Sequence, residues 1–159
     1  MINLINVILK IDIKANLNWL DVSRITNMSW LFHETCFDGD ISKWDVSHVE
    51  DFTLMFSYSK FTGDISNWNV SSVTSMGGMF TNSIFNGDLS KWNVKNVKSF
   101  ELMFNNSKFN NESIINWNIA EGVNMNSMFA NSSMSVARLT KIFKKWAIAL
   151  KIDHIIGYE

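Results

Sequence analysis

The chain has 159 residues, of which 47% are hydrophobic and 18% are charged, a composition typical of a folded protein rather than a disordered one. Its formal net charge of -1 at pH 7 gives no general attraction to nucleic acids or anionic lipid surfaces, so neither is an expected partner. The single cysteine, Cys36, excludes an internal disulfide framework.

The first predicted element, residues 1–19, begins with a short apolar run. Lys10 and Asp12 break this run, no basic residue precedes it, and neither a small-residue cleavage site nor a lipid-attachment cysteine follows it. We therefore expect an N-terminal cap of the folded domain rather than a secretion signal. No stretch of the sequence approaches the roughly 18 consecutive apolar residues that a membrane-spanning helix needs.

Residues 20–133 repeat with a period of 24 residues. We call each set of positions one period apart a column. Self-similarity at about 20–29 residues is typical of leucine-rich-type solenoids, in which stacking buries the apolar face of every unit. We therefore expect the aromatic columns to form the core, and these are Phe37, Phe61, Phe85 and Phe109, and Trp44, Trp68, Trp92 and Trp117, the last of them after 25 residues.

The spacing of apolar residues within one unit predicts its local structure. Between Ile65 and Val70 the spacing mixes three and two, as in a short strand that ends at a corner, and from Val70 to Met79 it is three, which suits a 3₁₀ or single-turn helical return. We predict an α/β repeat solenoid of five coils, a short right-handed, leucine-rich-repeat-like coil with short parallel strands and helical returns.

Gly39, Gly63 and Gly87 share a column in which Asn111 takes the fourth place. Because Asn is the non-glycine residue that best tolerates positive φ, we expect a left-handed corner there. The next column contains Asp40, Asp64 and Asp88, which we interpret as turn residues. Stacked carboxylates repel one another and calcium would relieve that repulsion, so the sequence leaves calcium binding by this column open.

Residues 134–159 depart from the period and are predicted to be an amphipathic capping helix with a tail. Val136, Leu139, Phe143 and Trp146 recur at three and four residues, and basic residues lie mostly on the opposite side. Such a helix can close the open end of a repeat array. The alternative is a basic helix that binds a membrane surface or a partner.

The titratable residues form no catalytic constellation. His33 and Cys36 lie close in sequence, but their columns hold unrelated residues in the other units, and His48 also falls in a variable column. There is no phosphate-binding loop, zinc-ligand spacing or triad order. We expect no enzymatic activity and no cofactor.

The units F-x-G-D-[IL]-S-x-W-[DN]-V-x-x-V-x-x-[MF]-x-x-M-F, which begin at Phe37, Phe61 and Phe85, closely resemble the leucine-rich-like repeats of BspA-like bacterial surface proteins. The resemblance covers about residues 20–133. It implies a protein displayed at the cell surface or secreted, which attaches to host matrix proteins or to other cells by recognition rather than catalysis.

We therefore expect a non-catalytic protein–protein recognition module, with bacterial adhesion as its setting. An intracellular structural or regulatory module is the alternative, and a carbohydrate-active solenoid is a distant third. Binding should use polar positions that vary from coil to coil on a constant scaffold, and the candidates occupy two adjacent columns: Lys43, Asn67, Lys91 and Asn116, and Ser42, Ser66 and Ser90.

Overall fold

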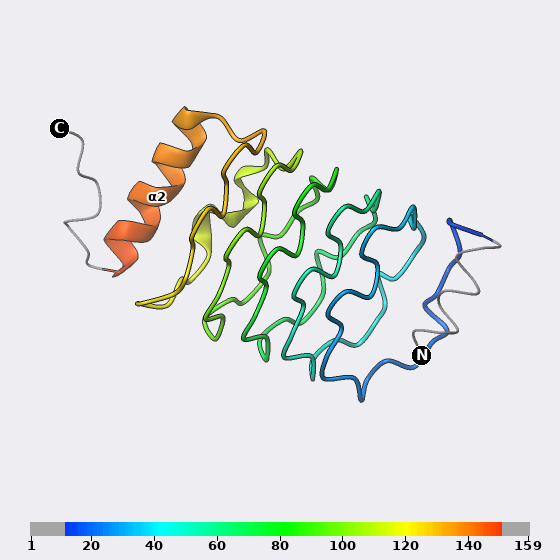
Figure 1. The fold of residues 1–159 in the computed structure, drawn as a ribbon. Coiled ribbons are helices and arrows are strands. Elements are labelled where there is room, and N and C mark those ends of the chain that lie inside the picture. The colour runs from blue at the N-terminus through cyan, green and yellow to red at the C-terminus, as the bar shows by residue number, and fades with distance from the viewer. Residues whose placement is uncertain (1–11, 151–159) are drawn as a thin grey trace.

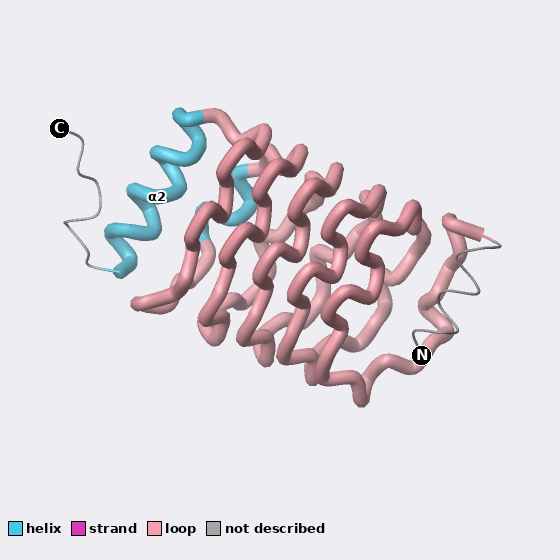
Figure 2. Tube along the Cα trace, viewed as in Figure 1, coloured by secondary structure: helices cyan, strands magenta, loops and turns pink. Residues whose placement is uncertain are grey.

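The computed structural model describes residues 12–150. Over this range the chain winds into a stack of similar coils, with helix α2 against the end of the stack opposite residue 12 (Figure 1). The described helices are the short 3₁₀ helix η1, Glu112–Asn116, and α2, Val136–Leu150. The coils before and between them consist of loops and turns (Figure 2).

The predicted α/β solenoid, with short parallel strands and helical returns, is wrong. Between residues 12 and 150 isolated parallel bridges, such as Asp51 to Ser75 and Ser75 to Ser99, occur without any strand or sheet. Helical returns do not recur either, since η1 is the one 3₁₀ helix in this range. The 24-residue offset of the bridges nevertheless follows the period of the sequence.

Overlapping turns replace the strands. In one coil Phe52, Leu54 and Phe56 donate their backbone N–H groups to carbonyl oxygens of the next coil, at N···O distances of 3.0, 2.9 and 2.9 Å. Met55 and Ser57, which alternate with these residues, donate to carbonyls three positions earlier in their own coil. Backbone groups are thus paired without an extended strand, and a spacing of three arises from successive turns.

The glycine column is not a left-handed corner. Gly39, Gly63 and Gly87 have no positive φ, and Asn111 has an extended backbone with φ -113°. The three glycines are explained by crowding instead, because a Cβ atom on Gly63, for example, would lie 2.7 Å from the ring of Phe61. Apart from Gly122, the positive φ angles of the described residues occur in two other columns: Trp30, Leu54, Gly78, Leu102 and Ser127, and Glu34, Tyr58, Asn82, Asn106 and Asn131.

Stacked aromatic rings fill the core, as the period predicts. The rings of Phe56 and Phe80 stack with their centroids 5.7 Å apart, and those of Trp44 and Trp68 at 6.5 Å. Each buried indole also needs a hydrogen-bond acceptor. Trp68 Nε1 donates to the carbonyl oxygen of Ile41, in the preceding coil, at 3.2 Å, and the other members of the column make the equivalent bond.

Helix α2 continues the tryptophan column at the end of the stack. The ring of Trp146 stacks on that of Trp117 with centroids 6.4 Å apart, and Trp146 Nε1 donates to the carbonyl oxygen of Ile114 at 3.2 Å. Ile142 is also fully buried, whereas Val136, predicted on the apolar face, is 73% exposed. The helix therefore covers the last coil and supplies the indole that a further coil would provide.

Parts of the predicted terminal elements lie outside the described residues. Residues 1–11 of the predicted N-terminal cap are outside the described range. Residues 151–159 of the predicted C-terminal helix and tail are outside it as well. The proposed boundaries at residues 19 and 133 stay predictions.

Substituting Trp68 by Ala is expected to lower the free energy of unfolding by roughly 3–5 kcal/mol, because it opens a cavity and leaves the Ile41 carbonyl without its donor. Chemical denaturation checks this. The exposed Trp19 is the matched control, and its change to Ala should alter stability by less than about 0.5 kcal/mol. Equal losses at both positions would contradict the core assignment.

Substituting Gly63 by Asn is expected to lower the free energy of unfolding by roughly 1–3 kcal/mol, because the new Cβ overlaps the ring of Phe61. Gly122 is the control, since it has φ +74° and open space around its missing side chain. Gly122→Asn should therefore be tolerated. A left-handed corner at Gly63 would instead tolerate Asn at both positions, and parallel melting curves distinguish the two cases.

Candidate functional site

The predicted binding columns lie mostly at the surface. Lys43, Asn67, Lys91 and Asn116 are exposed, Ser90 is exposed, and Ser42 and Ser66 are partly buried. Lys91 Nζ donates to Asn67 Oδ1 at 2.7 Å, so neighbouring coils contact each other within the column. The partner-binding role of these residues stays a prediction.

The aspartate column stabilises turns. Asp40, Asp64 and Asp88 each accept a hydrogen bond at Oδ1 from the backbone N–H group two residues later, at 3.0, 2.9 and 2.8 Å. The bond from the backbone of Ser66 lowers the pKa of Asp64, and Ser42 does the same for the pKa of Asp40. The predicted turn role is therefore confirmed. Within residues 12–150 no group of three or more His, Cys, Asp or Glu side chains could hold a metal ion.

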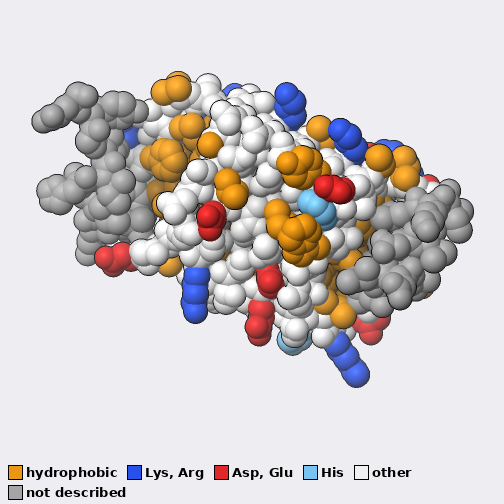
Figure 3. Space-filling model, in the orientation of Figure 1, with side chains coloured by type: hydrophobic (Ala, Val, Ile, Leu, Met, Phe, Trp, Pro, Cys, Tyr) orange, Lys and Arg blue, Asp and Glu red, His pale blue; other side chains and the backbone are white. Residues whose placement is uncertain are grey.

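A cluster of exposed aromatic residues lies at the left-handed turns of the first two coils. We define the aromatic patch as Trp30, His33, Glu34 and Tyr58. The imidazole of His33 makes edge-to-face contacts with both larger rings, with centroids 4.6 Å from Trp30 and 6.0 Å from Tyr58. Trp30 is 55% exposed and Tyr58 53% exposed. Figure 3 shows hydrophobic side chains gathered around a histidine and a carboxylate on this face.

The backbone beneath the patch is strained. Trp30, Glu34 and Tyr58 have φ values of 63°, 55° and 55°, in the left-handed region that bulky residues rarely adopt. The third coil uses Gly78 and Asn82 at the equivalent positions, and these are the residue types that suit such turns. Large side chains are therefore present where the turn disfavours them, and strain that persists in this way is a recurring feature of functional sites.

Apolar side chains continue the patch along the stack. Leu54, between Trp30 and Gly78 in its column, leans over the glycine, because a Cβ on Gly78 would lie 2.6 Å from Leu54 Cδ2. Leu102, one coil further, is 40% exposed. The patch is thus the aromatic end of a longer apolar strip.

No hydrogen bond joins His33 to Cys36 within the described residues. The structure engages His33 with two aromatic rings and with Glu34, whose Oε1 lies 3.4 Å from His33 Nε2. Cys36, the single cysteine of the chain, is exposed. The sequence places His33 in a column that holds unrelated residues in the other units, and no patch was expected there. The sequence does contain a signal for the patch. Trp30, Leu54 and Gly78 share one column, and a core column would keep side chains of similar size from coil to coil.

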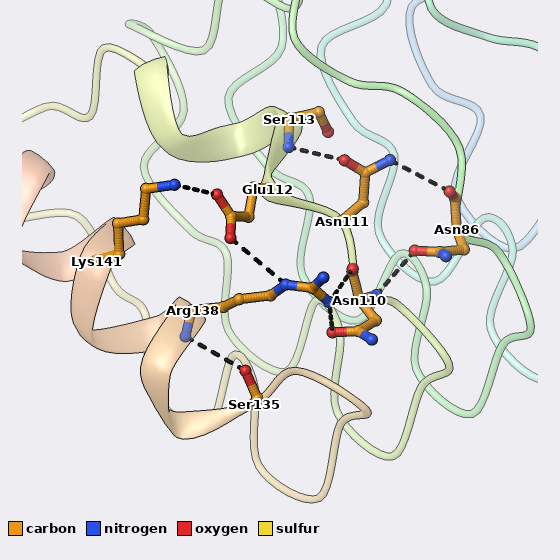
Figure 4. A network of polar contacts seen from close by, with 8 residues as sticks. All are labelled: Asn86, Asn110, Asn111, Glu112, Ser113, Ser135, Arg138 and Lys141. Carbon is orange, nitrogen blue, oxygen red and sulfur yellow. Dashed lines mark hydrogen bonds and ion pairs between the residues drawn. The ribbon is translucent and has the colours of Figure 1, made fainter.

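A polar network ties α2 to the last coils (Figure 4). Glu112 pairs with Lys141 and with Arg138, whose Nε lies 3.4 Å from Glu112 Oε1, and the bond from Lys141 is the main cause that lowers the pKa of Glu112. Arg138 also donates to the carbonyl oxygen of Asn110 at 2.9 Å. Two of the basic residues of the helix therefore hold it against the stack, which favours the capping role.

The helices of the described range are too short or too polar to cross a membrane.

A family model described as "Mycoplasma protein of unknown function, DUF285" matches residues 3–83 and 37–146. The two matched ranges overlap, as a repeated sequence allows, and together they extend over most of the chain. No curated protein and no solved structure matches the chain.

The lowered pKa of Asp64 predicts acid sensitivity. A carboxyl group whose pKa is lower in the folded state stabilises the fold above its unfolded pKa, about 3.9, and this contribution is lost as the pH falls through the folded pKa. Asp64→Asn should weaken that pH dependence while keeping the turn, because the amide oxygen still accepts the Ser66 N–H group, as Asn111 accepts that of Ser113.

Denaturation of both proteins between about pH 2 and pH 6 checks this prediction. Asp64→Ala is the control, since it removes the acceptor and should destabilise the protein at every pH in that range. Identical pH profiles for the native protein and Asp64→Asn would show that the turn carboxylate has no linked proton.

Proposed function

This chain belongs to the DUF285 family of Mycoplasma proteins of unknown function, and from that premise and the surface described above we propose that it is a non-catalytic protein-recognition module. The observation that carries the proposal is the aromatic patch, in which Trp30 and Tyr58 are more than half exposed on a strained backbone. Tryptophan and tyrosine are the side chains that contribute most to protein interfaces.

The patch is suited to a binding role because it is already ordered. His33 contacts both rings, so little conformational freedom remains to be lost when a partner covers them. Leu54 and Leu102 extend the apolar surface, and Asn82 and Asn106 provide amide groups beside it. An apolar centre with a polar border is the usual composition of a recognition surface.

The resemblance of the repeat units to BspA-like surface proteins supports adhesion as the setting, with a host matrix protein or a cell-surface protein as the partner. The columns of Lys43 and Ser42 offer a second variable surface for the same purpose. We expect no catalysis from the patch, since it combines a histidine and a carboxylate with aromatic side chains rather than with a nucleophile.

The test uses a double variant, Trp30→Asn with Tyr58→Asn, which copies the residue type that the repeat itself uses at Asn82. Binding of purified protein to cultured host cells and to immobilised matrix proteins should fall by about tenfold or more, as expected when a hot spot is removed. Stability should be unchanged or rise by up to about 1 kcal/mol for each site, because Asn relieves left-handed strain.

The stability measurement separates binding from structure. If the aromatic rings were mainly structural, the double variant would melt at a lower temperature than the native protein. Trp19→Ala is the matched control, since it removes another exposed indole, 66% accessible, from outside the patch. This control should retain binding.

A second variant, Lys43→Glu with Lys91→Glu, tests the predicted lysine column. We expect weaker binding with unchanged melting, because exposed charges contribute little to stability. Loss of binding in this variant alone would place the recognition surface on the lysine column and overturn the role of the patch. Absence of native binding to any of these surfaces, or a wholly cytosolic location on cell fractionation, would remove adhesion.

A further inference from the structure

We propose that the aromatic patch binds a guanidinium group, the side chain of an arginine on the partner protein. This proposal rests on the proposed recognition function and names the chemistry of its central contact. It draws on the aromatic rings, the position of Glu34, and the charges that face the patch.

The rings provide one part of the site. Trp30 and Tyr58 come from adjacent coils and both contact the ring of His33, yet more than half of each side chain is accessible. The face of an aromatic ring attracts a cation, tryptophan most strongly, and arginine is the most frequent partner of such rings. A planar guanidinium can also stack on the indole with a large area of contact.

Glu34 provides the second part. Its side chain is 69% exposed, and Oε1 lies beside Nε2 of His33 at the centre of the patch. In the described range, residues 12–150, no lysine or arginine lies within ion-pair distance of this carboxylate. Lys60 follows in the next coil, where its backbone N–H donates to the carbonyl oxygen of Thr35, and its side chain does not pair with Glu34.

The combination selects among possible occupants. A purely apolar partner would cover Glu34 and leave its charge without a counterion, which is costly. A quaternary ammonium group cannot donate a hydrogen bond to the carboxylate and binds best inside an aromatic cage, whereas Trp30 and Tyr58 are open to solvent. A guanidinium satisfies both parts, because it stacks on the ring and donates paired hydrogen bonds to a carboxylate.

The strain under the patch supports a site rather than a chance cluster. Trp30, Glu34 and Tyr58, which supply the two rings and the charge, are the patch residues that adopt positive φ. All three groups lie next to His33, which contacts both rings and the Glu34 carboxylate. Positions at which the backbone resists a large side chain carry every group that the proposed contact needs.

The experiment compares N-acetyl-arginine amide with N-acetyl-citrulline amide, which has the same shape without the charge. Each is titrated into the full chain, and the chemical shifts of the backbone amides around His33 are followed by NMR. We expect the arginine compound to bind about fivefold or more tightly than the citrulline compound, with dissociation constants in the millimolar range. Glu34→Gln should abolish this preference, and Trp30→Asn should abolish saturation.

Three results would overturn the proposal. These are equal binding of the two compounds, no saturation by the arginine compound, and tighter binding of tetramethylammonium, which would indicate a general organic cation site. Trp19→Ala is the control and should preserve the preference. Tyr58→Asn is a second variant, which places at this left-handed position the residue that the next coil uses at Asn82, and it should weaken binding of the arginine compound in a protein that folds as the native chain does.

The two proposals fail separately. If the double patch variant loses partner binding while arginine and citrulline bind equally, the recognition function stands and the guanidinium site is wrong. If arginine is preferred while the native protein binds no protein partner, the site exists and the recognition function is wrong.

Discussion

The fold depends on the tryptophan column, because each buried indole must find its hydrogen-bond acceptor in the preceding coil. Trp44, Trp68, Trp92 and Trp117 donate to carbonyl oxygens 27 or 28 residues earlier. An indole N–H left without an acceptor in the core would cost about 1–3 kcal/mol. Each coil therefore offers a carbonyl acceptor to the indole of the next coil, and at the last coil the Ile114 carbonyl takes its donor from an element outside the repeat. Trp146 of α2 is that element, since it repeats both the stacking and the hydrogen bond.

The period predicts which residues are buried, and the structure bears this out for the aromatic columns and for the turn role of the aspartates. It does not predict the backbone that joins them. A spacing of three occurs both in a 3₁₀ helix and in a series of overlapping turns. The two differ in where the backbone N–H groups donate, because in the turns some donate to carbonyl oxygens of the same coil and others to those of the next coil. The parallel strands were wrong for this reason. The pattern fixed the offset between coils and left the conformation undetermined.

The structure differs from the sequence-based prediction at two further places, the glycine column and the aromatic patch, and each difference has a local cause. Gly63 has no room for a side chain because the ring of Phe61 occupies the space, and sequence alone does not separate this cause from a positive φ. The aromatic patch does not follow from the columns that repeat. Trp30 and Tyr58 lie in columns where one coil differs from the next, and a site built on such differences has no period to reveal it. Its signal is a bulky residue at a position that another coil gives to glycine or asparagine.

The left-handed columns also limit how large such a site can become. Trp30, Glu34, Leu54, Tyr58 and Leu102 occupy positive φ positions without the glycine or asparagine that suits them. At about 1–2 kcal/mol each, their combined strain is comparable with the net stability of about 5–15 kcal/mol that a folded domain possesses. The stacked aromatic core has to offset this strain. Each further bulky residue at a left-handed position would therefore lower an already small net free energy of unfolding. A patch concentrated in the first two coils, with asparagine or glycine at most equivalent positions further along, is the arrangement that this limit favours.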